Sequence, residues 1–421
     1  MILQLTPMPL SGKIKAIASK SVAHRLLICA AFADRPTDIL CEELNRDIEA
    51  TAACLRALGA GMVRNGTLYH VTPIRALPEH ATLPCGESGS TLRFLVPVVA
   101  ALGVSASFVM ESRLPDRPLS PLREELEAHG VCLSAAGSNP LELSGKLIGS
   151  RFSIAGNVSS QFISGLLFAL SLRAEPSVLT VVGKIESAPY LEITADALSL
   201  FSARPEQNGS VYTVSACGKL ISPGTIAVEG DWSNASFALS AGAIGKHPVT
   251  VYGLNPHSHQ GDRAMVSLLE RFGAKIEEHD GSYTVFPSPL RGITVDASQI
   301  PDLVPILATV ASVAKGETRI VGASRLRLKE SDRLVAVSAM LNHLGASVAE
   351  TEDGLIIQGK NTLAGGRISS FNDHRIAMSA AIASSVCVSP VIIEGAESAA
   401  KSYPGFWEDL NTLGAKAEIL S

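Results

Sequence analysis

The chain has few aromatic and few charged residues for its length. Of its 421 residues, 5% are aromatic and 18% are charged, whereas 46% are hydrophobic, so the apolar mass is mainly Ala, Leu, Val and Ile. Long apolar runs are also missing, because the stretch Phe94–Val104 contains Pro97 and is far shorter than the roughly 18 residues of a membrane-spanning helix. The first residues lack the basic start of a secretory signal. We therefore expect no membrane segment and a cytoplasmic location.

Cysteine pairs and several widespread motifs are absent as well. The cysteines are odd in number, scattered and without a C-x-x-C pair, which favours free thiols in a reducing compartment; they are Cys29, Cys41, Cys54, Cys85, Cys132, Cys217 and Cys387. No P-loop, G-x-G-x-x-G or G-x-S-x-G motif occurs. His257 and His259 form the one close histidine pair, and no further ligand is spaced to join them, so we expect no metal. A net charge of −5 argues against nucleic-acid binding.

Internal repetition is what the chain has in abundance. The stretch Gly86–Gly103 starts with small polar residues and then turns almost wholly apolar, which predicts a buried helix whose N-terminus can bind an anion. Similar stretches recur at steps of 69, 70, 74, 68 and 71 residues, marked by Ser21, Ser90, Ser160, Asn234, Asp302 and Asp373. A second series, of segments such as LRALGA, interleaves at steps of 71, 72, 71, 72 and 69, starting at Leu55, Leu126, Leu198, Leu269, Leu341 and Leu410. The chain is therefore six copies of one unit of about seventy residues.

Each copy predicts the same order of elements: a buried helix, a β-branched strand, an amphipathic helix ending near Gly, and further strands. In the first copy the amphipathic helix is Asp47–Leu58, with Asp47 as N-cap and Gly59 after its end. The longest step, 74 residues, and a stretch rich in Gly and Pro separate the third copy from the fourth. We place one domain boundary near Val228–Asp231, with Lys13–Ser19 as the candidate for a second crossing.

In the first half of the chain, hydroxyl groups and cations gather at predicted helix starts. On a helix that begins near Ser21, Lys20 and Arg25 can converge with that hydroxyl on one anion. A capped helix with solvated charges is the alternative. Ser159-Ser160-Gln161 offers two hydroxyls and an amide, or an ordinary cap. Arg117 lies in a loop restricted by prolines that can aim its guanidinium, unless it is a plain surface arginine.

In the second half, cations stand where a helix dipole disfavours them. Lys329 and Arg333 flank a predicted helix start, with Ser331 as the expected N-cap. Asn372–Arg375 repeats this pattern at the sixth buried helix. An unfavourable interaction of this kind, between a cation and the helix dipole, is typical of a functional site. Asp302 starts a helix where the other copies have hydroxyls or cations, and is either a helix cap or a general base beside the cations.

Ten segments, in order along the whole chain, resemble the enolpyruvylshikimate-phosphate synthase family; they are KSVAHR, SGSTLR, DRPLSPL, NVSSQFISGLL, SAPYLEIT, VEGDWSNASF, IPDLVPILA, LKESDRL, NDHRIAM and KSYPGFWEDL. The resemblance implies a transferase of the shikimate pathway that joins phosphoenolpyruvate to shikimate-3-phosphate and releases phosphate, on the route to chorismate and the aromatic amino acids. It implies no metal and no organic cofactor. We expect a monomer that binds these two small molecules and neither nucleic acid nor membrane.

The resemblance also implies an α/β fold of two similar domains. Each holds three βαβαββ units with buried parallel helices, an inside-out α/β barrel, and the helix N-termini face an interdomain cleft that holds the active site. The expected domains are residues 19–229, and residues 1–18 together with 230–421. Because cations from both halves must converge on the ligands, ligand binding should close the domains.

Carried over position by position, the resemblance assigns residues to each substrate. The shikimate-3-phosphate site is Lys20, Ser21, Arg25, Ser159, Ser160, Gln161, Ser187, Tyr190, Asp302 and Lys329. The phosphoenolpyruvate site is Lys20, Gly89, Arg117, Gln161, Arg333, Arg375 and Lys401. The catalytic residues are Asp302 as proton acceptor, Glu330 as partner in proton transfer and Lys20. Two positions bordering the phosphoenolpyruvate site, Ser90 and Phe94, depart from the usual Thr and Pro of the family.

Two other functions remain open at this point. A sister enolpyruvyl transferase acts on UDP-N-acetylglucosamine with the same fold, but it carries a reactive cysteine where this chain has Ser112. A non-catalytic anion-binding module is the second alternative. Release of phosphate that depends on both substrates distinguishes the enzyme from the binding module.

Overall fold

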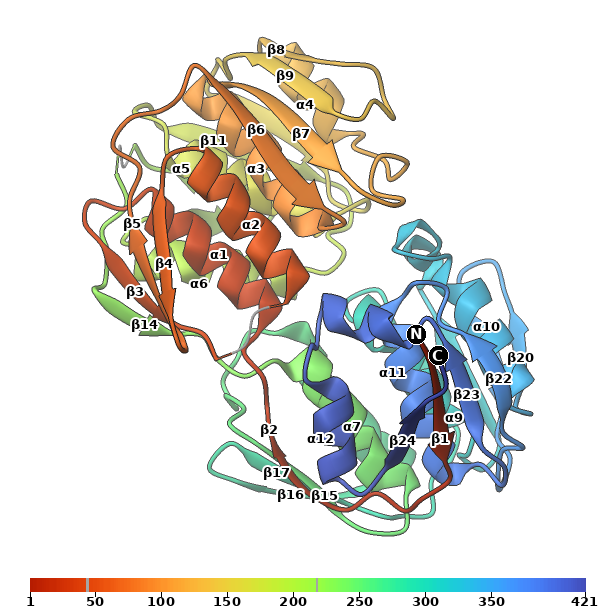
Figure 1. Ribbon diagram of the computed structural model, residues 1–421. Coiled ribbons are helices and arrows are strands. Elements are labelled where there is room, and N and C mark those ends of the chain that lie inside the picture. The colour runs from red at the N-terminus through yellow and green to blue at the C-terminus, as the bar shows by residue number, and fades with distance from the viewer. Residues whose placement is uncertain (43–44, 217–218) are drawn as a thin grey trace. The chain divides into compact units, whose positions relative to one another are not determined.

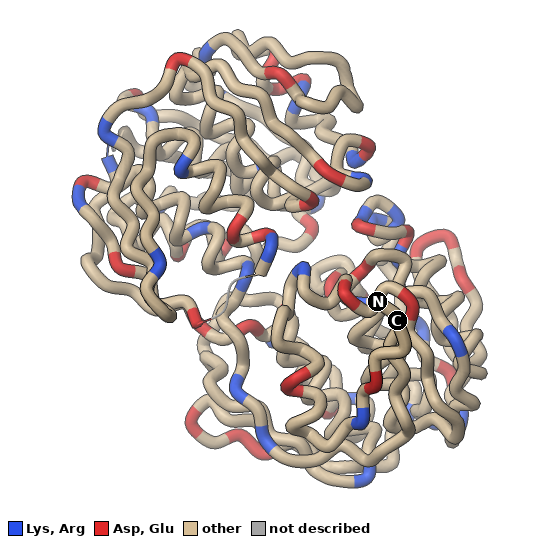
Figure 2. The backbone as a smooth tube through the Cα atoms, in the orientation of Figure 1, with Lys and Arg blue, Asp and Glu red and all other residues tan. Residues whose placement is uncertain are grey.

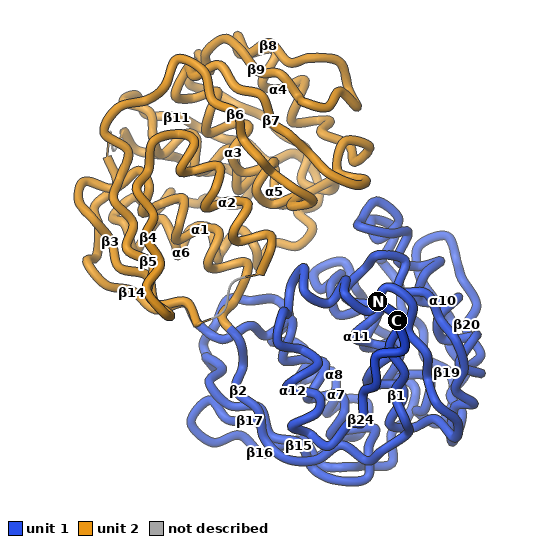
Figure 3. The backbone as a smooth tube through the Cα atoms, in the orientation of Figure 1, with its two compact units in different colours: residues 1–17, 229–421 blue, residues 18–228 orange. Residues whose placement is uncertain are grey.

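The computed structural model describes residues 1–42, 45–216 and 219–421. Two compact units are present (Figure 3): unit 1 comprises Met1–Ile17 with Glu229–Ser421, and unit 2 comprises Ala18–Val228. Each unit has its own hydrophobic core. Cys217 lies outside the described residues, and the other six cysteines are free thiols. No helix among the described residues is both long enough and apolar enough to cross a membrane.

The described part of unit 2 forms three four-stranded sheets, in the orders β14-β3-β5-β4, β6-β7-β9-β8 and β10-β11-β13-β12 (Figure 1). The strands are β3 (Thr37–Leu40), β4 (Gly61–Asn65), β5 (Leu68–Thr72), β6 (His80–Gly86), β7 (Ser105–Met110), β8 (Val131–Leu133), β9 (Leu141–Gly145), β10 (Arg151–Ala155), β11 (Ser177–Val182), β12 (Glu206–Asn208), β13 (Val211–Val214) and β14 (Thr225–Ala227). The helices are α1 (Lys20–Ala31), α2 (Arg46–Ala57), α3 (Gly89–Leu102), α4 (Leu122–Ala128), α5 (Ser160–Ser171) and α6 (Pro189–Leu200).

The described part of unit 1 also forms three sheets, in the orders β22-β23-β1-β24, β16-β17-β15-β2 and β18-β19-β21-β20. The strands are β1 (Ile2–Thr6), β2 (Gly12–Lys15), β15 (Val249–Tyr252), β16 (Lys275–His279), β17 (Ser282–Phe286), β18 (Thr294–Asp296), β19 (Glu317–Val321), β20 (Ser347–Glu350), β21 (Leu355–Gln358), β22 (Gly366–Ser369), β23 (Val391–Glu394) and β24 (Lys416–Ile419). The helices are α7 (Trp232–Ile244), α8 (Met265–Phe272), α9 (Val304–Ala311), α10 (Arg333–His343), α11 (His374–Ala383) and α12 (Phe406–Thr412), with the 3₁₀ helices η1 (Gly261–Ala264), η2 (Pro301–Leu303), η3 (Ser324–Leu328), η4 (Ser384–Val386) and η5 (Ala396–Lys401).

Every sheet in the described residues has the same topology. One parallel pair is followed by two antiparallel pairs, as where β7 runs parallel to β6 and antiparallel to β9, which in turn pairs with β8. The N-terminal strands complete two sheets of unit 1, because β1 lies between β23 and β24 and β2 runs parallel to β15. This recurrence confirms the predicted α/β class and the βαβαββ order of the repeats.

The apolar helices are buried on all sides, as their lack of a polar face predicts. In α3 and α5 nearly every residue is inaccessible to solvent, and the same is true of α9 and α11. The two helices α3 and α5 touch at Gly165, where an added Cβ would stand 2.3 Å from the carbonyl oxygen of Arg93. A residue with a side chain there would push the two helices apart.

The prediction for the cap of the first amphipathic helix is wrong. Helix α2 begins at Arg46, and its N-cap is Asn45, whose Oδ1 accepts a hydrogen bond from the N–H of Ile48 at 3.0 Å. Asp47 instead pairs with the Lys20 ammonium at 2.9 Å, so a tertiary partner takes this carboxylate away from the helix end. Gly59 follows the helix with φ 107°, as expected.

Candidate active site

Arg25 of α1 is the centre of one polar group in unit 2. Its guanidinium is buried and donates to the Ser21 carbonyl at 2.7 Å, to the Thr194 hydroxyl at 2.8 Å and to the Tyr190 carbonyl at 3.0 Å. Burial lowers the pKa of Arg25 to about 10, which still leaves the side chain charged at neutral pH. The contacts join the starts of α1 and α6 around one fixed cation.

Phe94 and His24 support this cation from inside the unit. The Phe94 ring lies under the Arg25 guanidinium, 4.8 Å from ring centroid to central carbon, and is itself buried. Phe94 therefore packs against a residue assigned to shikimate-3-phosphate. His24 Nδ1 lies 2.7 Å from the Thr51 hydroxyl, which lies 2.6 Å from that of Thr91, so one chain of polar contacts links α1, α2 and α3. Burial, followed by Lys20 and Arg25, holds the pKa of His24 well below its ordinary value and keeps the ring neutral.

A second polar group in unit 2 surrounds the start of α3. The Gln161 amide donates to the Ser90 hydroxyl at 2.9 Å, and its oxygen accepts from Arg93 Nη1 at 3.2 Å. An added Cβ on Gly89 would lie 2.5 Å from Arg93 Nη1 and 2.8 Å from Arg117 Nη1. Gly89 thus leaves room for two guanidinium groups beside the helix N-terminus, an arrangement suited to anions.

The family resemblance assigned no substrate to Arg93 of α3. The structure places it with Gly89, Gln161 and Arg117, and its position four residues after Gly89 on one helix face is the signal that points to this role. Ser88 caps α3, by accepting from the Thr91 N–H at 3.2 Å.

Three further serines of unit 2, Ser159, Ser160 and Ser187, were assigned to the shikimate-3-phosphate site by the family resemblance. Ser159 caps α5 and leaves the first residue, Ser160, nearly buried at the helix start. Ser187 precedes α6 and is buried in the left-handed region with φ 55°, a conformation that costs a non-glycine residue energy and that concentrates at functional sites.

In unit 1 a fully buried arginine binds three carboxylates. Arg333, the first residue of α10, donates from Nε to Asp373 at 2.7 Å, from Nη1 to Asp302 at 2.8 Å and from Nη2 to Glu330 at 2.7 Å. Its side chain is 1% exposed and that of Asp373 is 0% exposed. Burial opposes the charge of Arg333, but Asp373, Glu330 and Asp302 outweigh it and raise the pKa of this guanidinium above its ordinary value.

Further cations lie beside the same carboxylates. Arg375 Nη2 is 3.4 Å from Asp302 Oδ2, and its Nη1 donates to the Asp302 carbonyl at 3.0 Å. Lys329 Nζ is 3.9 Å from Asp302 Oδ1. Lys401, at the end of η5, donates to the carbonyl of Asn372 at 2.8 Å, directly before α11. The structure therefore gathers every predicted site residue of unit 1 around the start of α11.

The predicted cap at Ser331 is wrong. The N-cap of α10 is Asp332, whose Oδ1 accepts from the Val335 N–H at 3.2 Å. The Ser331 hydroxyl donates to Asp373 at 3.0 Å and so belongs to the Arg333 cluster. The N-cap of α9 is Leu303, which leaves the side chain of Asp302 to the cations.

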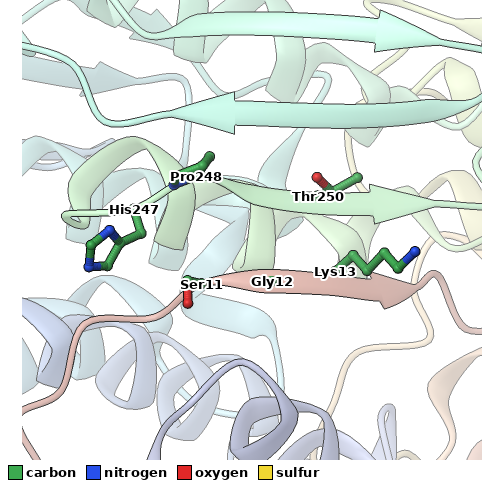
Figure 4. A pocket seen from close by; sticks show the side chains of 6 residues that line it. All are labelled: Ser11, Gly12, Lys13, His247, Pro248 and Thr250. Carbon is green, nitrogen blue, oxygen red and sulfur yellow. The ribbon is translucent and has the colours of Figure 1, made fainter.

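Basic and acidic residues are spread along both units (Figure 2), so the polar groups around Arg25, at the start of α3 and around Arg333 are local features of an acidic chain. A separate pocket of about 510 Å³ lies beside β2 and β15 and shares no residue with the predicted site (Figure 4); its lining is Ser11, Gly12, Lys13, His247, Pro248 and Thr250. Among the described residues, no three His, Cys, Asp or Glu side chains are grouped to hold a metal ion.

The repeated α/β units give the chain a fold similar to that of solved enolpyruvyl transferases. The enolpyruvyl transferase NikO from Streptomyces tendae aligns with a TM-score of 0.79 at 19% identity, covering 99% of this chain and 98% of that one. EPSP synthase from Acinetobacter baumannii aligns with a TM-score of 0.82 at 25% identity, covering 99% of this chain and 100% of that one.

Sequence comparison identifies the family. The family model EPSP synthase (3-phosphoshikimate 1-carboxyvinyltransferase) matches residues 5–410. A 3-phosphoshikimate 1-carboxyvinyltransferase from Clostridium kluyveri is 41% identical over 416 residues, covering 98% of this chain and 97% of the relative. One from Clostridium perfringens is 40% identical over 414 residues, covering 97% of each. The chain belongs to the EPSP synthase family, which confirms the resemblance found in the sequence.

Proposed function

We propose that this chain transfers the enolpyruvyl group of phosphoenolpyruvate to shikimate-3-phosphate and releases phosphate. Family membership over nearly the whole chain supports this reaction. The observation that carries the proposal is the binding of Arg333 to Asp302, Glu330 and Asp373, because it combines proton-transfer groups with a cation for an anionic substrate. An addition–elimination on two anions requires both.

We assign the two polar groups of unit 2 to the substrates as the family resemblance implies. The group around Arg25, with Lys20, Ser21 and Tyr190, would bind shikimate-3-phosphate. The group around Gly89 and Arg117 would bind phosphoenolpyruvate together with the cations of unit 1, with Gln161 reaching both substrates.

In the proposed reaction the methylene carbon of phosphoenolpyruvate gains a proton and the adjacent carbon becomes electrophilic. Asp302 accepts the proton of the substrate hydroxyl, whose oxygen bonds to that carbon and gives a tetrahedral intermediate. Loss of a methyl proton and of phosphate from the intermediate then restores the double bond. The family resemblance assigns the second proton to Glu330, which binds Arg333 at 2.7 Å, with Lys20 as a residue that shares this role.

The contacts of Arg333 suggest how substrate binding prepares these groups. A substrate carboxylate that binds Arg333 must take a place now held by Asp302 or Glu330, at 2.8 and 2.7 Å. A carboxylate released from a guanidinium holds a proton more tightly. Binding of the anionic substrate would therefore strengthen the group that has to accept or deliver a proton.

The variant Asp302→Asn tests the function and the base together. It preserves shape, so kcat should fall roughly 10²- to 10⁴-fold, the range of general acid–base catalysis, while the affinity for shikimate-3-phosphate by calorimetry stays close to that of the wild type. The rate is that of phosphate release with both substrates, and Glu394→Gln, an exposed carboxylate of the same unit, is the control. A kcat within a few-fold of the wild type would remove Asp302 from the mechanism.

The same phosphate-release assay distinguishes the proposed reaction from an anion-binding module and from the sister enolpyruvyl transferase. Phosphate release that needs only one substrate, or none at all, would favour an anion-binding module. Steady turnover with UDP-N-acetylglucosamine in place of shikimate-3-phosphate would favour the sister reaction.

A further inference from the structure

The hydroxyl group of Thr194 is a buried polar group of unit 2 that the proposed mechanism does not use. Thr194 belongs to α6 and is 0% exposed. Its Oγ1 accepts a hydrogen bond from Arg25 Nε of α1 at 2.8 Å and lies 2.8 Å from Ser164 Oγ of α5. The same hydroxyl donates to the Tyr190 carbonyl, one turn earlier in α6, at 3.0 Å. Three helices therefore meet at this one group.

These contacts use the full hydrogen-bonding capacity of the Thr194 hydroxyl. A hydroxyl offers one donor and two acceptor lone pairs. The single proton goes to the Tyr190 carbonyl, which makes Ser164 the donor in its contact with Thr194. The two lone pairs then accept from Arg25 Nε and from the Ser164 hydroxyl. Thr194 has no capacity left to bind a substrate, so it can act only through the groups that it holds.

The groups that Thr194 holds belong to the shikimate-3-phosphate site of the proposed function. Helix α6 packs against both α1 and α5. Each of these three helices carries in its first turn a residue assigned to this substrate, namely Ser21, Ser160 and Tyr190. Thr194 lies one turn further along α6 and joins that helix to Arg25, so it fixes the starts of the helices relative to one another.

Arg25 is the residue through which Thr194 can affect the substrate. Its guanidinium also contacts the Ser21 carbonyl at 2.7 Å, the Tyr190 carbonyl at 3.0 Å and the Ser164 hydroxyl at 3.4 Å. Within the described part of unit 2, these contacts and that with Thr194 occupy Nε, one N–H of Nη1 and both N–H groups of Nη2. The second N–H of Nη1 is left for an anion. Because the guanidinium is a rigid plane, the contact of Nε with Thr194 sets the direction of that remaining N–H.

We propose that Thr194 is a positioning residue for shikimate-3-phosphate, whose hydroxyl orients the Arg25 guanidinium and holds it against the start of α6. This inference rests on the proposed function, which assigns Arg25 to that substrate. The three residues that bind Thr194 are not among those assigned to phosphoenolpyruvate. Loss of the hydroxyl therefore weakens the binding of one substrate and spares that of the other.

The variant Thr194→Val tests this role, because it keeps the volume and the branched shape but removes the hydroxyl. It leaves the buried Nε–H of Arg25 without its acceptor, so the guanidinium must turn. We expect the Kd of shikimate-3-phosphate, measured by calorimetry, and its KM to rise roughly 10- to 100-fold, the usual effect of a misplaced binding group. The KM of phosphoenolpyruvate at saturating shikimate-3-phosphate, and kcat, should change less than about 3-fold.

Thr309→Val in α9 of unit 1 is the matched control. Thr309 is also 0% exposed, and its hydroxyl donates to the Pro305 carbonyl, one turn earlier in the chain, at 3.1 Å. It shares the burial and the backbone bond of Thr194 but not the contact with Arg25. The Kd of shikimate-3-phosphate should stay within about 2-fold of the wild type in this control.

The conservative variant Thr194→Ser distinguishes the hydroxyl from the packing of the side chain. It keeps all three hydrogen bonds, so the Kd of shikimate-3-phosphate should return to within about 3-fold of the wild type. A serine variant as weak as the valine variant overturns the inference. So does an equal rise of both KM values in Thr194→Val, because a purely structural role does not select one substrate.

A second site keeps the inference open to refutation if Thr194→Val does not fold. Ser164→Ala removes the donor to Thr194 Oγ1 and the weaker partner of Arg25 Nη2. The Kd of shikimate-3-phosphate should then rise about 2- to 5-fold, and an unchanged Kd overturns the inference.

The wild type, measured alongside, separates this inference from the proposed function. If the wild type neither binds shikimate-3-phosphate nor releases phosphate in the presence of both substrates, the proposed function is wrong. If the wild type does both and Thr194→Val binds shikimate-3-phosphate equally tightly, the function stands and only the role of Thr194 is refuted.

Discussion

The buried pair of Arg333 and Asp373 offers a direct test of what stabilises unit 1. Asp373 Oδ2 accepts from Arg333 Nε at 2.7 Å and from the Ser331 hydroxyl at 3.0 Å, while Oδ1 accepts from the Arg375 N–H at 3.0 Å and caps α11. Asp373→Asn keeps the volume but replaces one acceptor by a donor. If the new NH₂ takes the Oδ2 place it faces Arg333, and in the Oδ1 place it faces the N–H of Arg375. Either orientation leaves a buried donor against a donor.

The size of the expected loss of stability follows from the burial of the Arg333–Asp373 pair. Removing one partner of a buried ion pair costs about 3–5 kcal/mol, because the other charge is left uncompensated. Here Arg333 keeps its contacts with Asp302 and Glu330 at 2.8 and 2.7 Å, so its charge stays partly compensated. We therefore expect the low end of that range, about 3 kcal/mol in the free energy of unfolding of unit 1.

Tryptophan fluorescence during urea unfolding measures this loss of unfolding free energy in unit 1, the unit that contains Asp373. Both tryptophans of the chain, Trp232 and Trp407, belong to unit 1. The midpoint should fall in Asp373→Asn while the slope m is unchanged. The matched control is Glu394→Gln, which breaks the pair with Arg367 at 2.6 Å, with 54% and 45% of the two side chains exposed, and should cost less than about 1 kcal/mol. If the two variants unfold within about 0.5 kcal/mol of each other, burial of the Asp373 pair does not stabilise unit 1.

Two further predictions concern Gly89 and the pH dependence of stability. In Gly89→Ala the new Cβ would lie 2.5 Å from Arg93 Nη1 and 2.8 Å from Arg117 Nη1, so both guanidinium groups must move. KM for phosphoenolpyruvate should therefore rise roughly 10- to 100-fold. An unchanged KM would contradict the assignment of Gly89 to the phosphoenolpyruvate site. Because the pKa of Asp262, a buried carboxylate of η1, is raised from 3.8 to about 7, the stability it contributes is complete below pH 3.8 and is lost as the pH rises through 7. The wild type should therefore lose about 3 kcal/mol between about pH 5 and pH 8 that Asp262→Asn retains, and parallel pH curves of tryptophan-monitored unfolding would disprove this.

Repetition made most of the fold predictable from the sequence. One buried helix with a polar start is a weak signal, but six at nearly constant steps predicted six copies of one unit of helices and strands. The family resemblance implied the α/β fold and the βαβαββ order that the sheets confirm. Strands rich in β-branched residues and bounded by Gly or Pro carry a local signal of this kind, as at Val391–Glu394. Hydrophobic pattern and turn residues carry this information locally, so no tertiary contact is needed to read it.

Choices between adjacent polar residues were not predictable, because tertiary partners decide them. Asn45 caps α2 while Asp47 pairs with Lys20 from another helix. Asp332 caps α10 because Ser331 contacts Asp373, a residue about forty positions away that α11 brings close. In each case two residues meet the local rule for a cap equally well.

The burial of Asp262 was not predictable from the sequence for a related reason. Asp262 stands in an ordinary acidic and basic stretch, next to Arg263, and nothing in its neighbours along the chain shows that it is buried. Burial, followed by the charge of Asp302, raises the pKa of Asp262, and both effects arise only in the folded chain. A charge pattern along the chain cannot carry that information.

The violations of local rules nevertheless mark the candidate site. Lys20 and Arg333 are the first residues of their helices, where the helix dipole opposes a positive charge. The structure shows how each is compensated, by Asp47 for Lys20 and by three carboxylates for Arg333. Compensation by carboxylates keeps a cation in place without ligand and leaves it exchangeable for a substrate anion, which a covering of apolar side chains would not allow. A cation that breaks the helix rule and is held by acidic groups is therefore better evidence of an anion site than a cation in solvent.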